Sequence, residues 1–367
     1  MKIVEETKLD FDDILLVPAR SPAASRKEVN LKRTYRFFHS PKQWTGLPIM
    51  AANMDTTGTF AMGAALNSHD SVTCLHKHYD AKKINDYFEY YNIEKNVWVS
   101  VGMGSSELSK LQEIEDSLHH SPNICIDIAN GYTEKFVSFC DDVRMAFPES
   151  IIMAGNVCTP EMVQELILHG GVDIVKIGIG PGSACTTRLK TGVGYPQLSA
   201  IIECSHAAHG LKSGEGRMGL ICADGGCRIP ADVCKAFAAN ADFVMLGGML
   251  AGADECEGEW EYHKESIEEV LKKGTHIVDR TRKKNLLFYG MSSEKAQEKY
   301  NGGMNSYAAS EGRVKKIPYK GPVDSVMADI KGGLRSCCAY VGATCIKDLP
   351  KCAKAVKVNR THFDTFV

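Results

Sequence analysis

Eight short apolar runs recur along the chain, and each is followed by a longer segment with helical spacing. The runs are rich in Val and Ile and apolar at consecutive positions, as in strands buried on both faces. They lie at Leu47–Ala52, Val72–Leu75, Val97–Val101, Ile124–Ile128, Ile151–Ala154, Ile174–Ile177, Leu220–Ala223 and Phe243–Leu246. Pro160 and Pro230 suit the first positions of the intervening helices. Eight alternating units predict an α/β protein with a closed (β/α)8 TIM barrel, and an open doubly wound sheet is the alternative.

Two segments do not follow this repeat. Residues 1–46 precede the first run, and residues about 252–321 separate the last run from a final helix predicted at Pro322–Ser336. We expect one barrel domain over residues 1–367, with an N-terminal extension and an insert, because long insertions in compact domains often act as flaps. Within the insert, Trp260, Ile267 and Leu271 recur at roughly helical spacing and predict an additional surface helix.

The composition narrows the class of protein. The 43 basic and 45 acidic side chains give a net charge of −2, so we expect no nucleic-acid or membrane partner. Fourteen cysteines in a chain of this length do not indicate a secreted disulfide framework. The acidic start has no apolar stretch typical of a signal peptide, and no run approaches the length of a membrane helix. We therefore expect a reduced, cytoplasmic protein.

The sequence GIGPGSACTTR, residues 178–188, follows the sixth run. Its glycines and proline predict a tight loop, whose carbonyl groups suit a cation and whose N–H groups suit a phosphate. Cys185 stands in the middle with Arg188 nearby, and a neighbouring positive charge favours the nucleophilic thiolate. A glycine turn with an incidental cysteine is the structural alternative.

Two further glycine motifs close the seventh and eighth runs. Asp224–Gly226 reads DGG and Leu246–Gly248 reads LGG, at positions where barrels commonly bind phosphate. Asp224 is a candidate acceptor for ribose hydroxyls, and a helix N-cap before Pro230 is its structural alternative. A G-x-G-x-x-G motif after a first strand is missing, which disfavours a Rossmann site. We interpret His76 and His78 as structural residues.

Together, GIGPGSACTTR, DGGC, FVMLGGM, LFYGMSSE and the N-terminal LDFDDILL resemble the IMP dehydrogenase/GMP reductase family over nearly the whole chain. Only about twenty residues separate Lys77 from Val97, which leaves no room for the regulatory insertion of IMP dehydrogenases. The Arg-Tyr pair of their flap is also missing from the insert. CTTR and ASEG resemble the GMP reductase branch, and Glu311 of ASEG can accept from the 2-amino group and N1–H of guanine.

The resemblance implies NADPH-dependent reductive deamination of GMP to IMP and ammonia, in purine salvage and interconversion. Cys185 would form a covalent thioimidate, with Thr187 and Glu311 as general acid/base partners. An IMP dehydrogenase without the regulatory insertion and a non-catalytic purine-nucleotide sensor remain alternatives, and a solvated surface residue is the alternative for Glu311. The implied substrate-binding residues are Ser183, Asp224, Gly225, Gly226, Gly247, Gly248, Gly290, Met291, Ser292, Ala308, Ser310, Glu311 and Gly312.

The resemblance also implies sites for NADPH and for K⁺. The implied cofactor residues are Ser25, Arg26, Lys77, Asp127, Ile128, Ala129, Met291, Tyr307, Ala308, Ser336, Cys337, Cys338 and Ala339. The cation would lie on carbonyl groups of Gly180, Gly182 and Cys185, near Arg188. Ser25 and Arg26 resemble residues that reach a neighbouring subunit's cofactor, which implies a homo-oligomer, usually a tetramer.

One departure from the family pattern affects this site. The family usually has an arginine three residues before the glutamate of ASEG, and this chain has Ala308. The change removes a cation that would touch nucleotide and cofactor, so that either affinity is lower or Arg313 or Arg188 compensates.

Overall fold

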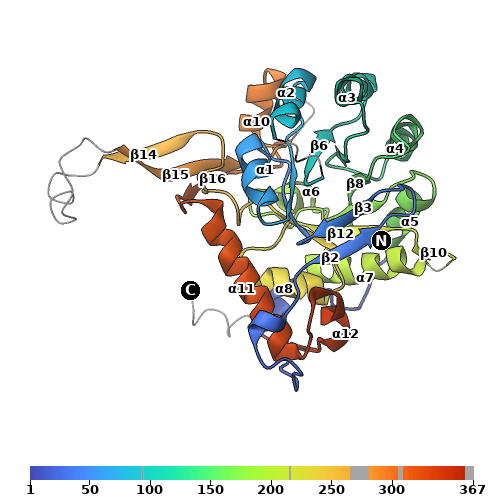
Figure 1. Cartoon of the computed structure of the whole chain (residues 1–367), viewed down its shortest axis with the longest axis vertical. Coiled ribbons are helices and arrows are strands. Elements are labelled where there is room, and N and C mark those ends of the chain that lie inside the picture. Colours follow the sequence, from blue (N-terminus) through green and yellow to red (C-terminus); the bar gives the residue numbers. More distant parts are fainter. Residues whose placement is uncertain (92, 94, 215, 265–280, 305–308, 360–367) are drawn as a thin grey trace.

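A closed barrel of eight parallel strands forms the centre of the molecule (Figure 1). The computed structural model describes residues 1–91, 93, 95–214, 216–264, 281–304 and 309–359. The barrel strands are β4 Ile49–Ala51, β5 Val72–Cys74, β6 Val97–Val101, β7 Ile124–Asp127, β8 Ile152–Val157, β9 Ile174–Ile177, β12 Leu220–Asp224 and β13 Phe243–Leu246. Each coincides with one predicted run, and β13 pairs with β4 to close the barrel. The (β/α)8 prediction is therefore confirmed, and the open-sheet alternative is wrong.

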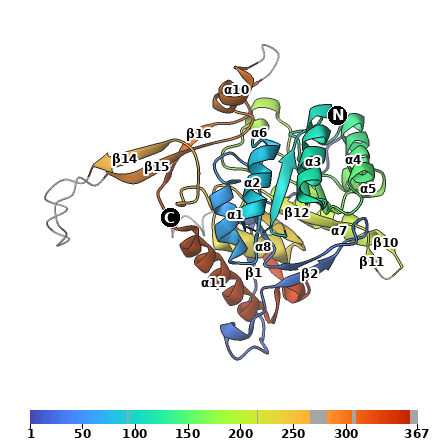
Figure 2. The same cartoon turned by 45° about the horizontal axis from the view of Figure 1, so that its top comes forward.

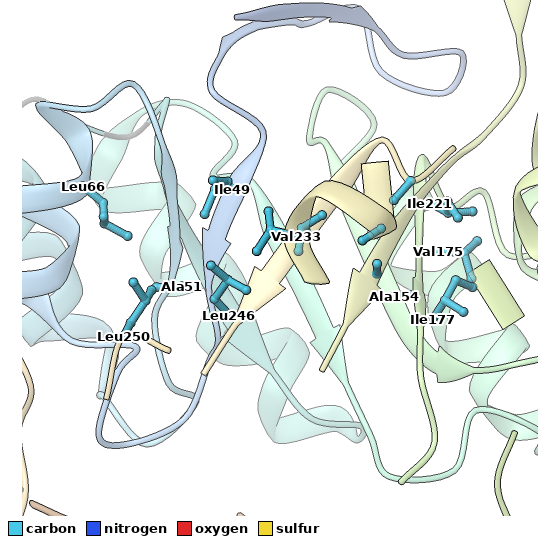
Figure 3. Close-up of a cluster of buried hydrophobic side chains, with 14 of the residues drawn as sticks. Ile49, Ala51, Leu66, Ala154, Val175, Ile177, Ile221, Val233, Leu246 and Leu250 are labelled. Atoms are coloured by element: carbon cyan, nitrogen blue, oxygen red, sulfur yellow. The ribbon is translucent and has the colours of Figure 1, made fainter. Parts of the chain in front are cut away.

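Both faces of the barrel strands are buried, which explains their continuous apolar pattern. In β4, Ile49 and Ala51 belong to the cluster that packs against the surrounding helices (Figure 3). Met50, between them, belongs to a second cluster with Trp98 and Phe243. Because successive side chains of a strand point to opposite faces, a strand must be apolar at every position to fill both clusters.

Helices surround the barrel and connect its strands. They are α1 Phe60–Asn67, α2 Ala81–Tyr91, α3 Ser105–Leu118, α4 Glu134–Ala146, α5 Pro160–Leu168, α6 Thr187–Thr191, α7 Gln197–Gly210, α8 Pro230–Ala238 and α11 Val323–Val341. Pro160 and Pro230 occupy first-turn positions, as predicted. Helix α11 runs beyond the predicted end at Ser336 and stops where Gly342 adopts φ +82, a left-handed conformation that favours glycine.

Short elements of the N-terminal extension pack against the C-terminal part of the chain. Strand β1 (Ile14–Leu16) pairs with β17 (Ala355–Lys357) in an antiparallel ribbon, and β2 (Arg33–Arg36) pairs with β3 (Gln43–Gly46). The backbone N–H of Asn30 donates to Thr344 O at 2.9 Å, which continues the contact between the two ends. These smaller elements are η1 Phe11–Asp13, β1 Ile14–Leu16, η2 Arg26–Glu28, β2 Arg33–Arg36, β3 Gln43–Gly46, β10 Lys212–Ser213, β11 Gly216–Arg217, η3 Ile346–Asp348, α12 Leu349–Cys352 and β17 Ala355–Lys357.

In the described residues of the insert, three strands form an antiparallel sheet, and one helix lies between the second and third of them. The elements are β14 Trp260–Lys264, β15 Thr281–Tyr289, α10 Glu294–Asn301 and β16 Val314–Pro318. Both views show β14 and β15 projecting away from the barrel (Figures 1 and 2).

The helix predicted from the spacing of Trp260 is wrong at that residue, which lies in β14. Trp260 and Tyr262 alternate with polar residues, and aromatic residues at a spacing of two favour a strand. The Trp260 ring packs edge-on against Tyr319, with 6.1 Å between ring centroids, and Lys283 lies over it. The other two residues of that prediction, Ile267 and Leu271, lie outside the described residues.

Candidate active site

Three predicted catalytic side chains form a continuous chain of hydrogen bonds. Cys185 lies in the loop after β9, Thr187 begins α6, and Glu311 precedes β16 in the insert. The Thr187 hydroxyl lies 3.2 Å from Cys185 Sγ and donates to Glu311 Oε2 at 2.6 Å. The fold thus brings together a thiol, a hydroxyl and a carboxylate, the last 124 residues away along the chain. This order of groups suits the transfer of a proton between the thiol site and the carboxylate.

Backbone pairing holds the insert against the cysteine loop. Cys185 and Gly312 form an isolated antiparallel bridge, Thr186 N donates to Glu311 O at 2.8 Å, and Arg313 N donates to Ala184 O at 2.9 Å. A Cβ on Gly312 would lie 2.8 Å from Cβ of Ser293, so a side chain there would displace the segment. The position of Glu311 is therefore determined by main-chain contacts on both sides.

The Gly290–Ser292 turn lies next to this bridge. The carbonyl of Ser292 accepts a hydrogen bond from Glu311 N at 3.2 Å, and Gly290 lies against Ala184 and Gly312. The Ser310 hydroxyl donates to Gly312 O at 3.3 Å. The turn and the ASEG segment, both predicted to bind substrate, are therefore neighbours in the structure.

The predicted substrate residues of the barrel lie around the same loop. Gly225 and Gly226 pack against Pro181 of the cysteine loop. Gly248 lies beside the Ser183 hydroxyl, and Gly247 lies beside Met54. The loops after β9, β12 and β13 therefore converge at the carboxyl ends of the strands, where active sites of such barrels are found.

A buried lysine joins two of the predicted ligand-binding carboxylates. Lys176 of β9 is 2% exposed, contacts Asp127 of β7, and donates to Asp224 Oδ2 at 3.1 Å. Burial would lower the pKa of Lys176, but the charges of Asp127 and Asp224 outweigh it and raise the pKa well above its usual value. The ammonium therefore stays charged between the carboxylates predicted to bind the cofactor and the ribose.

Asp224 does not act as a helix N-cap, because Ile229 occupies that position in α8. Instead, Asp224 Oδ2 accepts a second hydrogen bond, from the side-chain amide of Asn156 at 2.8 Å. Sequence reasoning missed Lys176 and Asn156. The signal for Lys176 was available: it is the single charged residue in the apolar run IVKI, where an unpaired charge would be costly.

The predicted cofactor residues fall into two separate groups. Lys77 follows β5. Burial would raise the pKa of Asp127 at the end of β7, but the charge of Lys176 and, to a smaller extent, that of Lys77 lower it. Ile128 and Ala129 continue directly from Asp127, and Ile128 N donates to Gly155 O at 2.9 Å. This first group therefore lies at the same end of the barrel as Lys176.

The second group lies near the end of α11. Ser25 caps η2, Arg26 begins it, and η2 packs against α11, which contains the run Ser336–Ala339. This end of α11 lies away from the segment that joins the helix to the insert (Figure 1). One chain therefore does not bring the two groups together. Tyr307 and Ala308 lie outside the described residues.

Arg188 contacts the backbone of its own loop. Its guanidinium donates to Ile179 O at 3.3 Å, contacts Tyr195 O, and lies 3.5 Å from the Asp10 carboxylate. Gly180 has φ +79, and a Cβ there would lie 2.5 Å from the Arg188 side chain, so this glycine permits the packing. Arg188 thus stabilises the loop that carries Gly180, Gly182 and Cys185. Arg313 donates to Ser183 O at 2.9 Å, in the same loop.

The described residues contain no group of three or more His, Cys, Asp or Glu side chains able to hold a metal ion. They also contain no helix long and apolar enough to cross a membrane.

Comparisons with known proteins agree with this arrangement. The family model described as "IMP dehydrogenase / GMP reductase domain" matches residues 8–364. The chain is 50% identical to a GMP reductase of Yersinia enterocolitica, over 98% of this chain and 97% of that protein. It is 49% identical to GMP reductase 1 of Homo sapiens, over 100% of this chain and 99% of that protein.

Proposed function

The chain belongs to the IMP dehydrogenase/GMP reductase family, and we propose from this that it acts as a GMP reductase, converting GMP to IMP and ammonia with NADPH. The observation that carries the assignment to this branch is the relay from Cys185 through Thr187 to Glu311. A carboxylate at this end of the relay suits guanine, which has a 2-amino group that hypoxanthine lacks.

The relay accounts for the proton movements of the first step. The thiolate of Cys185 attacks C2 of the purine, and the thiol proton passes through the Thr187 hydroxyl to Glu311. Glu311 and Thr187 return a proton to the 2-amino group, so that the bond from C2 to nitrogen breaks and ammonia leaves. A thioimidate on Cys185 remains. A bound NADPH would supply a hydride at C2. The Cys185 thiolate would then depart as the leaving group, and IMP would be released.

Asp127 and Asp224, which flank the buried Lys176, would hold NADPH and GMP together with the glycine loops. Asp224 is oriented by Lys176 and Asn156 and would accept from the hydroxyls of the GMP ribose. Gly225, Gly226, Gly247, Gly248 and Ser183 would surround the phosphate, and the Gly290–Ser292 turn with Ser310 and Gly312 would lie along the base. Lys77 and Asp127–Ala129 fit a cofactor, because a cation and a carboxylate lie near each other at the carboxyl ends of β5 and β7.

Potassium and the second cofactor group extend the proposal. Carbonyl oxygens are suitable ligands for K⁺, and Gly180, Gly182 and Cys185 offer them in a tight turn stabilised by Arg188. Because Ser25, Arg26 and Ser336–Ala339 lie apart from Lys77 and Asp127, we propose that they complete the cofactor site of a neighbouring subunit, in a homotetramer. All fourteen cysteines are free thiols, which fits a reducing compartment such as the cytoplasm.

An assay of the purified protein with K⁺ tests the proposal. GMP should cause loss of the absorbance of NADPH, with one ammonia released per NADPH oxidised. Cys185→Ala should abolish turnover, by more than about 10⁴-fold, and retain GMP binding in calorimetry. Reduction of NAD⁺ with IMP alone would assign the chain to the dehydrogenase branch instead. GMP binding with no turnover by the wild type would favour the nucleotide sensor.

A further inference from the structure

Asp55 is a buried carboxylate that the proposed chemistry does not use. It lies in the loop between β4 and α1 and is 3% exposed. Its Oδ2 accepts hydrogen bonds from Tyr289 OH at 2.7 Å, Tyr300 OH at 2.8 Å and Lys299 Nζ at 2.9 Å. Burial alone would raise the pKa of Asp55, but these three donors hold it below its usual value. The carboxylate is therefore ionised, and all three donors come from one distant segment, the insert.

The three donors stand on both sides of one turn. Tyr289 is the last residue of β15, and Lys299 and Tyr300 lie in the last turn of α10. Between them runs Gly290–Ser292, the turn whose Ser292 carbonyl accepts the backbone N–H of Glu311. A single barrel carboxylate thus anchors the chain before and after the turn that contacts the relay residue.

The loops around Asp55 add a second connection to the insert. The ring of His78 stacks on that of Tyr300, with centroids 3.4 Å apart and planes 3° from parallel. In the loop of Asp55 itself, the Asn53 side chain lies near Asp127 and adds to the effect of Lys176 in lowering the pKa of that carboxyl. Asp55 and its three donors therefore lie between the predicted cofactor residues and the predicted substrate turn.

We propose that Asp55 is a positioning residue for GMP binding: it holds the Gly290–Ser292 turn, and through Ser292 the Glu311 backbone, in the arrangement that receives the base. Asp55 acts through Tyr289, Lys299 and Tyr300 and does not touch the reacting atoms. The inference rests on the proposed function for the identity of the ligand.

Four variants of the full-length protein test this role. Asp55→Asn removes the charge with little change of volume, and Lys299→Met removes one donor from a side chain that is 46% exposed, so that folding is preserved. Lys299→Arg keeps the charge and serves as the conservative rescue. Lys316→Met is the matched control in the insert, because the Lys316 side chain is 62% exposed and pairs with Glu261.

We expect Asp55→Asn to raise the KM for GMP by about tenfold or more, and Lys299→Met by about three- to tenfold, with the KM for NADPH within about twofold of wild type. Lys299→Arg and Lys316→Met should behave as wild type. Combining Asp55→Asn with Lys299→Met in one protein should be little worse than Asp55→Asn alone, because both changes remove the same contact. Amides of Gly290–Ser293 should exchange hydrogen faster in Asp55→Asn, while those of the barrel strands are unchanged.

An unaltered KM for GMP in both Asp55→Asn and Lys299→Met would overturn the inference, even if the melting temperature fell, since the role would then be structural only. Hydrogen exchange needs no turnover and separates the two proposals. Faster exchange of the turn in a protein whose wild type lacks GMP-dependent activity would remove the proposed function and leave the anchoring of the turn supported.

Discussion

Lysine side chains occupy opposite environments in the barrel and in the insert sheet. In β9 of the barrel, the Lys176 side chain is 2% exposed and lies between two carboxylates. In β16 of the insert, the Lys316 side chain is 62% exposed and pairs with Glu261 across the sheet. Removing one partner of a buried group leaves uncompensated charge, whereas exposed pairs are screened by water. Environment, more than residue type, therefore determines what a charged contact contributes to stability.

The residues of the candidate active site also come from these two regions. Cys185 and Thr187 belong to the barrel, where the strand before them is buried on both faces. Glu311 belongs to the insert, which contacts the barrel through a short backbone bridge, through the Asp55 hydrogen bonds and through Leu286 and Phe288 of β15, which are buried in the main core. The barrel half of the site thus follows a strand buried on both faces, whereas the insert half is positioned by polar contacts in addition to the buried side chains of β15.

The largest effect on stability is expected when the buried lysine of the barrel is replaced by methionine, compared with the same replacement at the exposed lysine of the insert sheet. Lys176→Met should lower the free energy of unfolding by about 3–5 kcal/mol, because Asp127 and Asp224 lose their shared cation inside the barrel. Lys316→Met should change it by less than about 1 kcal/mol. Urea unfolding followed by circular dichroism measures both. Equal losses in the two variants would contradict the comparison.

Glu311→Gln breaks the insert half of the relay. We expect kcat with GMP to fall about 10²–10³-fold, because the amide cannot take up the proton that Thr187 passes on. Thr187→Val should cause a similar loss, and the double variant should be no slower than the worse single variant, since the two side chains act in one chain of hydrogen bonds. Glu298→Gln on α10 is the control. Additive losses would show that the two side chains act independently.

A smaller effect is expected on how stability depends on pH, through a histidine close to where the barrel meets the insert. Burial lowers the pKa of His76 to about 4, from 6.5 when unfolded. The unfolded chain therefore binds more protons as the pH falls from about 6.5 towards 4, and the stability present above pH 6.5 is lost in that window. We expect His76 to account for about 1–2 kcal/mol between pH 7 and pH 5. His78, whose pKa burial also lowers to about 4, is more exposed and should add less.

Urea unfolding of His76→Asn at both pH values measures this contribution. The side-chain oxygen of asparagine replaces Nδ1 as the acceptor for His78 N. The variant should lose less stability than wild type on acidification. An identical loss in the two proteins would mean that His76 is not responsible.

The barrel could be predicted from the chain because its signal is local. A strand such as Ile174–Ile177 must fill space on both faces, so that its apolar run is visible without knowledge of its neighbours. The insert sheet could not be predicted in this way, because its strands are partly exposed and their pattern is weaker. The helix prediction at Trp260 depends on its spacing to Ile267 and Leu271. The residues next to Trp260 alternate between aromatic and polar, as in a strand.

In the candidate site, too, some features could be predicted from the sequence and others could not. The cysteine loop and the two glycine motifs were predictable, because thiols, glycines and carboxylates at strand ends indicate their chemistry by type and position. The roles of Lys176, Asn156 and Asp55 were not, because each depends on a partner distant in the chain.

The sequence by itself therefore determined the eight strands, the loops at their carboxyl ends and the groups available for chemistry. Only the tertiary structure decided which groups meet: Lys176 with Asp127 across 49 residues, Thr187 with Glu311 across 124, and Asp55 with Tyr289 across 234. The physical reason is that helical and strand patterns arise from burial of neighbouring residues, whereas such contacts form only when barrel closure and packing of the insert compensate the entropy of closing long loops.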